Sequence, residues 1–418
     1  MTDQARPRLV ALIANRRMLG VLLLGFSSGF PIAFVAGTLQ AWLKTYGLNI
    51  KLIGMASLLQ LPYLLKFLWA PFLDRYTPPF LGRRRGWILP AQLFAAALLF
   101  SMSTLNPVLS VSAVAAVALT LAFVGASQDI VIDAYRADIV RPEERGPAAS
   151  VTQIGYRAAL LVSGAVTFVL AEKIGWPATF RTMACVMLAT VCFTIVSPEP
   201  QSGRSPISLW RAVIEPLREI LSRWPFLPLL AVLLLYKLGE ALTLALSTAY
   251  LQELGYRLSE IGYASKFLGQ IATMAGVIAG GVCVAKWGLY RSLVVLAIGQ
   301  IVTALPYLLL LMVDKTLPAM YLTVIVQNLG DGMGTAAFTA LLMAMCNVQF
   351  SAFQYALLSS ISAFPRIVLG GPIAGYIVAD LGGWMTLYTT CVIVALPGLF
   401  ALPLLRNRIM SVDRPTAS

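Results

Sequence analysis

Two aspartates four residues apart are the residues of this sequence best suited to chemistry. Asp129 and Asp133 stand near the end of a long apolar run that begins at about residue 108. Positions i and i+4 of a helix share a face, so both carboxylates point the same way. A charged carboxylate near the centre of a bilayer costs about 2.5–3.5 kcal/mol, and two like charges at this spacing repel. We therefore expect both to face protein or water, and at least one to bind and release a proton.

The elements that must position these aspartates are membrane-spanning helices. The chain has 418 residues, of which 59% are hydrophobic and only 12% are charged, whereas a soluble domain carries about 25% charged residues. The sequence contains no histidine, and its five cysteines are far apart, which argues against a Ser-His-Asp triad, a zinc site or a disulfide framework. We predict a polytopic membrane protein that is not an enzyme and needs no metal or cofactor.

Hydrophobic runs separated by charged or Pro/Gly turns predict an all-α membrane protein with twelve transmembrane helices. Their approximate limits are 17–43, 50–73, 87–104, 108–136, 147–171, 177–196, 225–252, 258–284, 292–311, 317–346, 353–379 and 384–405. We predict six-helix bundles at 1–196 and 225–418, joined by a polar, basic cytoplasmic loop at 197–224. Lys and Arg are concentrated in the segments that lie on the same side of the membrane as the N-terminus. Because cytoplasmic loops carry the excess of Lys and Arg, both termini are expected in the cytoplasm. The net charge of +13 is explained by this topology and by contact of the basic residues with anionic lipid headgroups. No nucleic-acid partner is therefore expected.

The two halves repeat at an offset of about 208 residues. Gly47 recurs as Gly255, and Trp176 recurs as Trp384. A six-plus-six duplication is typical of the major facilitator fold, in which the substrate binds between the halves near the middle of the membrane. The sequence therefore predicts this fold.

Nine ionisable side chains fall inside the predicted spans, where burial of each must be offset by pairing or by function. They are Lys66, Asp129, Asp133, Arg157, Lys237, Glu240, Lys266, Asp331 and Arg366. None lies in the third, sixth, ninth or twelfth span, the outer helices of the major facilitator architecture. We predict that the four acids couple transport to protons. The alternative is structural, with Lys237 and Glu240 neutralising one another and Asp133 pairing with Arg136.

Two local patterns match known motifs. Residues 25–29, Gly-Phe-Ser-Ser-Gly, match the G-x-S-x-G nucleophile pattern, but without a histidine they are better explained as a small-residue packing face. No Walker loop is present in the sequence, so this chain alone is not expected to use ATP. The loop at 74–85 combines an acid at a helix end with clustered arginines, a pattern typical of major facilitators between spans 2 and 3. The residues predicted to form a conformational latch there are Asp74, Arg75, Arg83 and Arg84.

Several segments resemble the AmpG family of muropeptide permeases. They are 37–42 (GTLQAW), 66–71 (KFLWAP), 74–87, 126–134, 144–146, 235–240 and 332–335. The resemblance runs from the first span to the last, and the DRYTPP block at 74–79 is quite specific. It implies proton-driven import of anhydro-muropeptides, GlcNAc–1,6-anhydroMurNAc with a short peptide, from periplasm to cytoplasm. It also implies the inner membrane of a Gram-negative bacterium, and a link to peptidoglycan recycling and β-lactamase induction.

A muropeptide presents carboxylates, sugar hydroxyls and amides to its carrier. We expect its carboxylates to meet buried cations, and its hydroxyls and amides to meet amide side chains and aromatic rings. The predicted substrate-binding residues are Lys66, Arg157, Tyr156, Gln128, Gln60, Tyr63, Gln40, Lys237, Tyr236, Lys266, Gln327, Asn328 and Arg366. We expect a monomer whose partners are the glycopeptide, protons and membrane lipid. The alternatives are a major facilitator for another substrate, such as a drug/proton antiporter or an acyl-CoA-type carrier, and an intramembrane enzyme.

Overall fold

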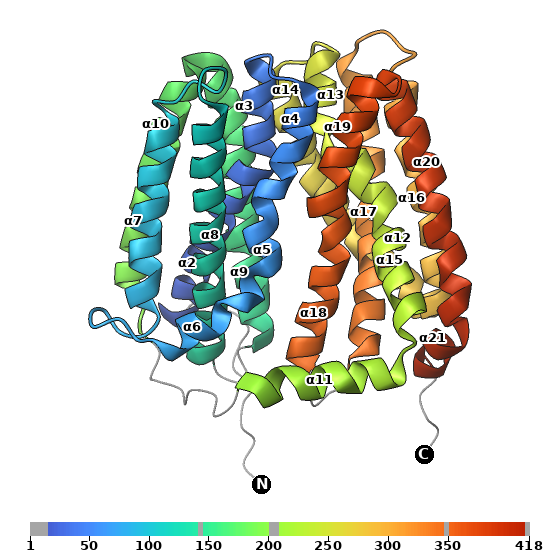
Figure 1. Ribbon diagram of the computed structural model, residues 1–418, viewed down its shortest axis with the longest axis horizontal. Helices are drawn as coiled ribbons and strands as arrows, with labels where there is room; N and C mark the ends of the chain where they lie inside the picture. The colour runs from blue at the N-terminus through green and yellow to red at the C-terminus, as the bar shows by residue number, and fades with distance from the viewer. Residues whose placement is uncertain (1–15, 141–144, 200–208, 347–350, 414–418) are drawn as a thin grey trace, which may run out of the picture. The chain divides into compact units, whose positions relative to one another are not determined.

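The chain folds into two compact units built from helices. The computed structural model describes residues 16–140, 145–199, 209–346 and 351–413, and all regular structure in these ranges is helical (Figure 1). One unit comprises Met1–Trp42 and Leu59–Pro206, and the other comprises Leu43–Leu58 and Ile207–Ser418. Residues 43–58 therefore pack with the second unit although they lie near the N-terminus in sequence.

The first unit is organised around α2 and α8. Its elements are α2 (Arg16–Ala33), the π-helical turn η1 (Phe34–Thr38), α3 (Leu39–Thr45), which continues into the second unit, α5 (Leu61–Leu65), η3 (Lys66–Leu68), α6 (Ala70–Arg75), α7 (Arg85–Met102), α8 (Val111–Ile139), α9 (Arg145–Leu161), η5 (Val162–Val166) and α10 (Thr167–Val196). Helix α2 packs against α8 and α9, and α7 packs against α8 and α10. The core between them holds the buried face of each helix, including polar residues of the candidate site.

The second unit is organised around α12 and α17. Its elements are α4 (Ile50–Met55), α11 (Leu209–Arg223), α12 (Phe226–Ala245), α13 (Ser247–Glu253), α14 (Leu258–Ile261), η6 (Gly262–Leu268), α15 (Gly269–Trp287), α16 (Leu289–Leu309), α17 (Leu317–Met345), α18 (Ser351–Phe364), η8 (Pro365–Gly370), α19 (Gly371–Asp380), α20 (Gly383–Ala401), η9 (Leu402–Leu405) and α21 (Arg406–Asp413). Helix α15 packs against α17, α12 packs against α20, and α16 packs against both α17 and α20.

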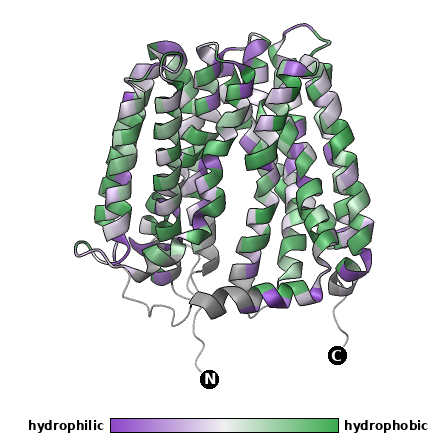
Figure 2. Cartoon of the chain, in the orientation of Figure 1, coloured by the Kyte–Doolittle hydropathy of each residue, from purple (hydrophilic) through white to green (hydrophobic). Residues whose placement is uncertain are grey.

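The helices are long and apolar enough to cross a membrane. Ten segments qualify by length and composition, and one of them, Val151–Val196, is 46 residues long. It is broken at Gly175, whose φ of 77° no regular helix contains, so it accounts for two crossings of a hydrocarbon core about 30 Å thick. Helix α17 is not among the ten because Gln327, Asn328 and Asp331 lower its hydropathy. With α17 added, the twelve predicted spans are all present, and Figure 2 shows hydrophobic residues along most of their length.

The segment predicted as a polar loop at 197–224 contains a helix. Residues 209–223 form α11, which is strongly amphipathic. Its C-terminal end is anchored because Arg223 pairs with Glu219 at 2.6 Å and donates to the Met345 carbonyl at 3.0 Å, and Gln354 donates to Glu219 at 2.5 Å. The sequence analysis did not predict this helix because its apolar residues are interrupted by basic ones and lie on one face only, so they form no continuous hydrophobic run.

The predicted repeat is visible in the packing of each unit. Trp42 and Phe180 of the first unit form an edge-on pair with ring centroids 4.8 Å apart. The positions 208 residues later, Tyr250 and Tyr388, form an edge-on pair of the second unit at 4.9 Å. The same offset thus relates both the sequence and the contacts, which confirms the internal duplication.

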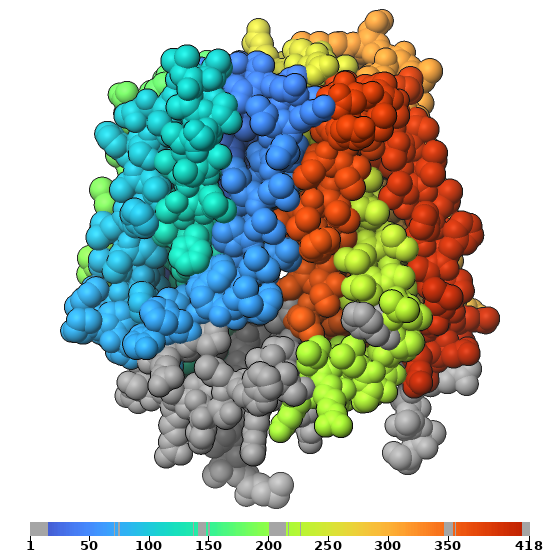
Figure 3. All heavy atoms as spheres, in the orientation of Figure 1, coloured from blue at the N-terminus to red at the C-terminus, as the bar shows by residue number. Residues whose placement is uncertain are grey.

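Glycines allow close approach of helices at two places. A Cβ atom at Gly25 would lie 2.8 Å from the Thr152 carbonyl oxygen of α9, which confirms that the 25–29 pattern is a packing face. In the second unit a Cβ atom at Gly54 would lie 2.3 Å from the Gly371 carbonyl oxygen, where α4 meets α19 (Figure 3). Backbones that approach this closely exclude any larger side chain.

Candidate functional site

In the first unit, Asp129 lies at the centre of a polar cluster formed by α2, α8 and η3. The Lys66 ammonium lies 2.5 Å from Asp129 Oδ2, and the Ser28 hydroxyl donates to Asp129 Oδ1. The Asp129 side chain is 17% exposed and that of Lys66 is 34% exposed. A charge-assisted hydrogen bond and a hydroxyl therefore compensate this carboxylate inside its membrane span.

Asp133 lies one helical turn further along α8 and is more exposed. Its carboxylate is 3.8 Å from Lys66 Nζ and 3.2 Å from the Arg136 guanidinium. The predicted pairing with Arg136 is confirmed, and Lys66 contacts both aspartates. Two carboxylates and two cations balance in this cluster, so protonation of Asp129 would leave Lys66 with only its longer contact to Asp133.

In the second unit, Lys237 and Glu240 of α12 form the corresponding pair. Lys237 Nζ lies 2.5 Å from Glu240 Oε2 and donates to Thr335 Oγ1 of α17 at 3.0 Å. The predicted pairing is therefore confirmed, with the two side chains only 14% and 16% exposed. Asp331 of α17 is close enough to Glu240 to interact with it electrostatically. Two neighbouring carboxylates repel one another unless a cation or a shared proton compensates them.

Two further cations of the second unit stand in π-helical turns. Lys266 of η6 and Arg366 of η8 are close enough to repel one another electrostatically. Arg366 also acts on Lys237, Glu240 and Asp331. Among these five residues the cations outnumber the carboxylates by three to two.

Two of the predicted binding residues are used in helix packing. Gln128 Nε2 donates to the carbonyl oxygen and the hydroxyl of Ser27, at 2.8 and 2.7 Å, and so joins α8 to α2. Asn328 Nδ2 donates to the Val324 carbonyl at 2.8 Å, and its Oδ1 accepts from Thr273 of α15 at 3.2 Å. Both amide nitrogens are occupied within the bundles, so neither residue enters the proposed set of substrate contacts.

The predicted aromatic residues lie beside the charged clusters. Tyr63 is close enough to Asp129 and Tyr156 to interact electrostatically. Tyr236 stacks on Phe338, with ring centroids 5.1 Å apart. The buried hydroxyls of Tyr63 and Tyr236 have no hydrogen-bond partner among the residues that the structure describes. Each of these hydroxyls could therefore form a hydrogen bond with a bound water.

The remaining predicted binding residues are spread over both units. Gln40, Gln60 and Gln327 are buried, and Tyr156 and Arg157 are half-buried on α9. The structure brings Lys66, Asp129, Asp133 and Tyr63 together in one cluster, and Lys237, Glu240, Asp331, Lys266 and Arg366 in another. The predicted charges other than Arg157 therefore form one cluster in each unit.

The loop between α6 and α7 is bonded to the ends of two other helices. Arg84 Nε lies 2.7 Å from Asp138 Oδ2 of α8. The backbone N–H groups of Arg84 and Arg85 donate to the Glu199 carboxylate at 2.8 and 3.2 Å, and the Arg85 guanidinium lies 3.4 Å from it. The chain just after α10 is thus tied to the start of α7, as a carboxylate at a helix N-terminus favours.

Other members of the predicted latch are described only in part. The side chains of Asp74 and Arg75 lie outside the described part of the chain, and Arg83 is half-buried. The acids Asp138 and Glu199 were missed in the sequence because they flank the spans rather than lie within them. Ser28 and Thr335 were missed because hydroxyl residues are common in packing faces and carry no spacing signal.

Comparison with known proteins agrees with this architecture. Residues 21–370 match the family model of the Major Facilitator Superfamily. The chain is 42% identical over 392 residues to the anhydromuropeptide permease of Escherichia coli K12, which covers 93% of this chain and 79% of that protein. It is 30% identical over 413 residues to an AmpG-named transporter of Rickettsia conorii, covering 96% and 99% of the two chains.

Solved structures share the fold at low identity. A peptide transporter in complex with sulfate superposes with a TM-score of 0.71 at 13% identity, covering 98% of this chain and 97% of that one. A bacterial homologue of the lysosomal transporter Spinster gives 0.68 at 15% identity, with 96% and 98% covered. These relatives are transporters, and so is this protein. The chain belongs to the major facilitator superfamily and, within it, to the AmpG family of permeases.

Proposed function

We propose that this protein imports anhydro-muropeptides across the inner membrane of a Gram-negative bacterium by proton symport. The substrate would be GlcNAc–1,6-anhydroMurNAc with a short peptide, as the 42% identity to the Escherichia coli anhydromuropeptide permease supports. The carrier would act as a monomer with both termini in the cytoplasm. Its product would enter peptidoglycan recycling and, through it, β-lactamase induction.

The observation that carries this proposal is the pair of charge clusters, one in each unit. Each contains a lysine bonded to a carboxylate at 2.5 Å, Lys66 to Asp129 and Lys237 to Glu240, with a second carboxylate beside it. Buried ionisable groups inside membrane spans are expensive and mark ion or substrate pathways. Protonation of one acid would weaken its hold on the lysine, and a substrate carboxylate could then take its place.

Substrate carboxylates are proposed to bind mainly to the cationic surplus of the second unit. Lys266 and Arg366 repel one another, and an anion beside them would relieve this repulsion. Lys66 and Lys237 would join only when their own acids are protonated, which couples substrate binding to proton binding. Arg157 is proposed as a cation for the peptide, and Tyr63 is proposed to offer an aromatic face to the sugars.

Uptake into proteoliposomes tests the proposal. Purified protein is reconstituted, and radiolabelled anhydro-muropeptide is added outside with and without an inward proton gradient. We expect accumulation above the external concentration only with the gradient, and competition by unlabelled muropeptide but not by acetyl-CoA. Gradient-independent uptake, or accumulation when the gradient is reversed, would contradict proton symport. Efflux of a cationic drug in the same vesicles would favour an antiporter instead.

A further inference from the structure

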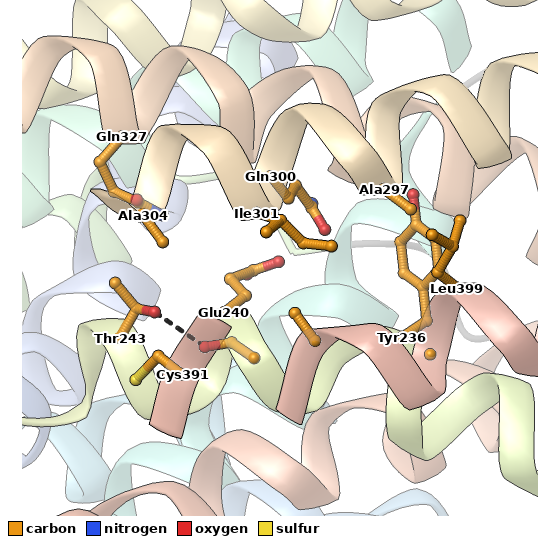
Figure 4. Close-up of a pocket in the computed structure, with 13 residues that line it drawn as sticks. Tyr236, Glu240, Thr243, Ala297, Gln300, Ile301, Ala304, Gln327, Cys391 and Leu399 are labelled. Carbon is orange, nitrogen blue, oxygen red and sulfur yellow. Dashed lines mark hydrogen bonds between the residues drawn. The ribbon is translucent and has the colours of Figure 1, made fainter. Parts of the chain in front are cut away.

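A small enclosed cavity lies beside Glu240 in the second unit. It is lined by residues of α12, α16, α17 and α20, and Glu240 points into it toward Gln300 and Ile301 of α16 (Figure 4). The space open to the centre of a water molecule is about 20 Å³, and one bound water needs about 10–15 Å³ by this measure. The cavity therefore has room for one water and for no larger ligand.

The polar atoms around this cavity are short of partners. The Tyr236 hydroxyl, Gln300 Nε2 and Gln327 Oε1 are buried and have no hydrogen-bond partner among the described residues. The Thr243 hydroxyl, by contrast, donates to the Gly239 carbonyl at 2.9 Å. Glu240 and Gln300 lie between Gln327 and Tyr236 in this lining (Figure 4), and a water beside them could make at least two of its usual two to four hydrogen bonds.

The internal repeat shows why Gln300 Nε2 has no partner among the described residues. Gln300 lies 208 residues after Gln92, which is the same offset that relates the aromatic pairs. Gln92 is fully buried on α7, where it donates to Ser27 Oγ at 2.8 Å and to the Thr190 carbonyl at 3.1 Å, and accepts from Thr194 at 2.8 Å. The residues 208 positions after these three partners are Leu235, Gly398 and Leu402.

The second unit has thus kept the glutamine and lost every side-chain hydroxyl that satisfied it. The position equivalent to Ile32 of the first unit is Glu240. Where the first unit has a closed packing network, the second has a carboxylate facing an amide across a water-sized cavity. Gly334 leaves room for the amide, since a Cβ atom there would lie 1.8 Å from Gln300 Nε2.

We infer that Gln300 is a positioning residue for the proton on Glu240, acting through a water bound in this cavity. The inference rests on the proposed function, in which Glu240 and Asp331 hold the coupled proton. The water would accept from the Gln300 amide or the Tyr236 hydroxyl and donate to the ionised Glu240 carboxylate. A donor that faces the charged form stabilises it, so Gln300 would lower the proton affinity of Glu240.

The groups that face Glu240 come from four elements. Its titratable and charged neighbours are Lys237 and Tyr236 of α12, Asp331 of α17, Arg366 of η8 and Cys391 of α20. Helix α16 contributes only Ala297, Gln300, Ile301 and Ala304 to the cavity lining. Gln300 is therefore the means by which an outer helix of the unit acts on the buried charge.

The test is substrate counterflow in proteoliposomes at equal pH on both sides, measured across a pH series. Counterflow needs the protonated carrier but no net proton movement. In Gln300→Met, which is similar in size but cannot hydrogen-bond, the alkaline midpoint of the profile should move up by about one pH unit, a tenfold change in proton affinity. Gln300→Asn should give a smaller shift in the same direction. The matched control is Gln92→Met, which should lower the melting temperature without moving the midpoint.

The Glu240→Gln variant distinguishes a failure of the Gln300 inference from a failure of the proposed proton site at Glu240. If Glu240→Gln makes counterflow independent of pH and Gln300→Met leaves the midpoint unchanged, the role of Gln300 is refuted while Glu240 stands. If Glu240→Gln keeps the wild-type profile, both the proton assignment and the inference fail. Equal shifts in Gln300→Met and Gln92→Met would also overturn the inference, because they would indicate a general effect of loosened packing.

Discussion

The two aspartates of α8 share one lysine, and this predicts how much stability each contributes. In Asp129→Asn, Lys66 loses its 2.5 Å partner but keeps Asp133 at 3.8 Å. Unit charges about 4 Å apart attract by about 4 kcal/mol at an effective dielectric constant of 20. Because Lys66 and Asp133 are 34% and 49% exposed, solvent screens much of this attraction. We expect the single variant to lose about 1 kcal/mol of unfolding free energy.

Removal of both carboxylates should be disproportionately costly. Asp129→Asn with Asp133→Asn leaves Lys66 within a membrane span without either partner, and loss of a partner from a buried pair costs about 3–5 kcal/mol. After the same discount for exposure, we expect the double variant to exceed the sum of the singles by about 1 kcal/mol or more. The assay is a double-mutant cycle by denaturant unfolding of the purified protein in detergent micelles. Strict additivity of the two singles would refute the shared-lysine reasoning.

Three other substitutions test single contacts. Arg84→Gln should lower uptake severalfold and the melting temperature slightly, because Asp138 loses its partner. Asp138→Asn should have the same effect. If only one of the two variants changes uptake, the pair does not act as proposed. Gly371→Ala should lower the unfolding free energy by about 1–3 kcal/mol because α4 leaves no space for a methyl group. Gly281→Ala is the control, since Gly281 has open space around it. Equal melting temperatures for the two variants would contradict this packing. Arg157→Gln should weaken binding of peptide-bearing muropeptide more than that of the peptide-free disaccharide, measured by calorimetry, and equal losses with a lower melting temperature would leave it only a structural role.

Periodicity and charge counts in the sequence predicted the helices and the ionisable residues that form the two charge clusters. The twelve spans, the break near residue 175 and the 208-residue repeat all follow from hydrophobic runs and glycines, which report local conformation directly. Local pairs were also predictable. Lys237 with Glu240 and Asp133 with Arg136 are three residues apart, so helical geometry alone brings them together.

Contacts between helices were not predictable, because they depend on which face each helix presents. Lys66 and Asp129 are 63 residues apart in sequence, and nothing in their spacing joins them. Gln128 precedes Asp129 yet serves packing, since its side chain lies on the neighbouring face of α8. The π-helical turns η6 and η8 make such faces harder still to assign, because each extra residue in a turn rotates the rest of the helix about its axis. Lys266 and Arg366 both stand in these turns.

Substrate-induced proton movement tests the central claim most directly. Proteoliposomes containing the protein and a trapped pH indicator, with no imposed gradient, receive anhydro-muropeptide from outside. Proton symport predicts acidification of the interior that saturates with substrate, is absent from protein-free liposomes and is lost in Glu240→Gln or Asp129→Asn. Uptake of the labelled muropeptide with no change in internal pH, or with alkalinisation, would contradict the account.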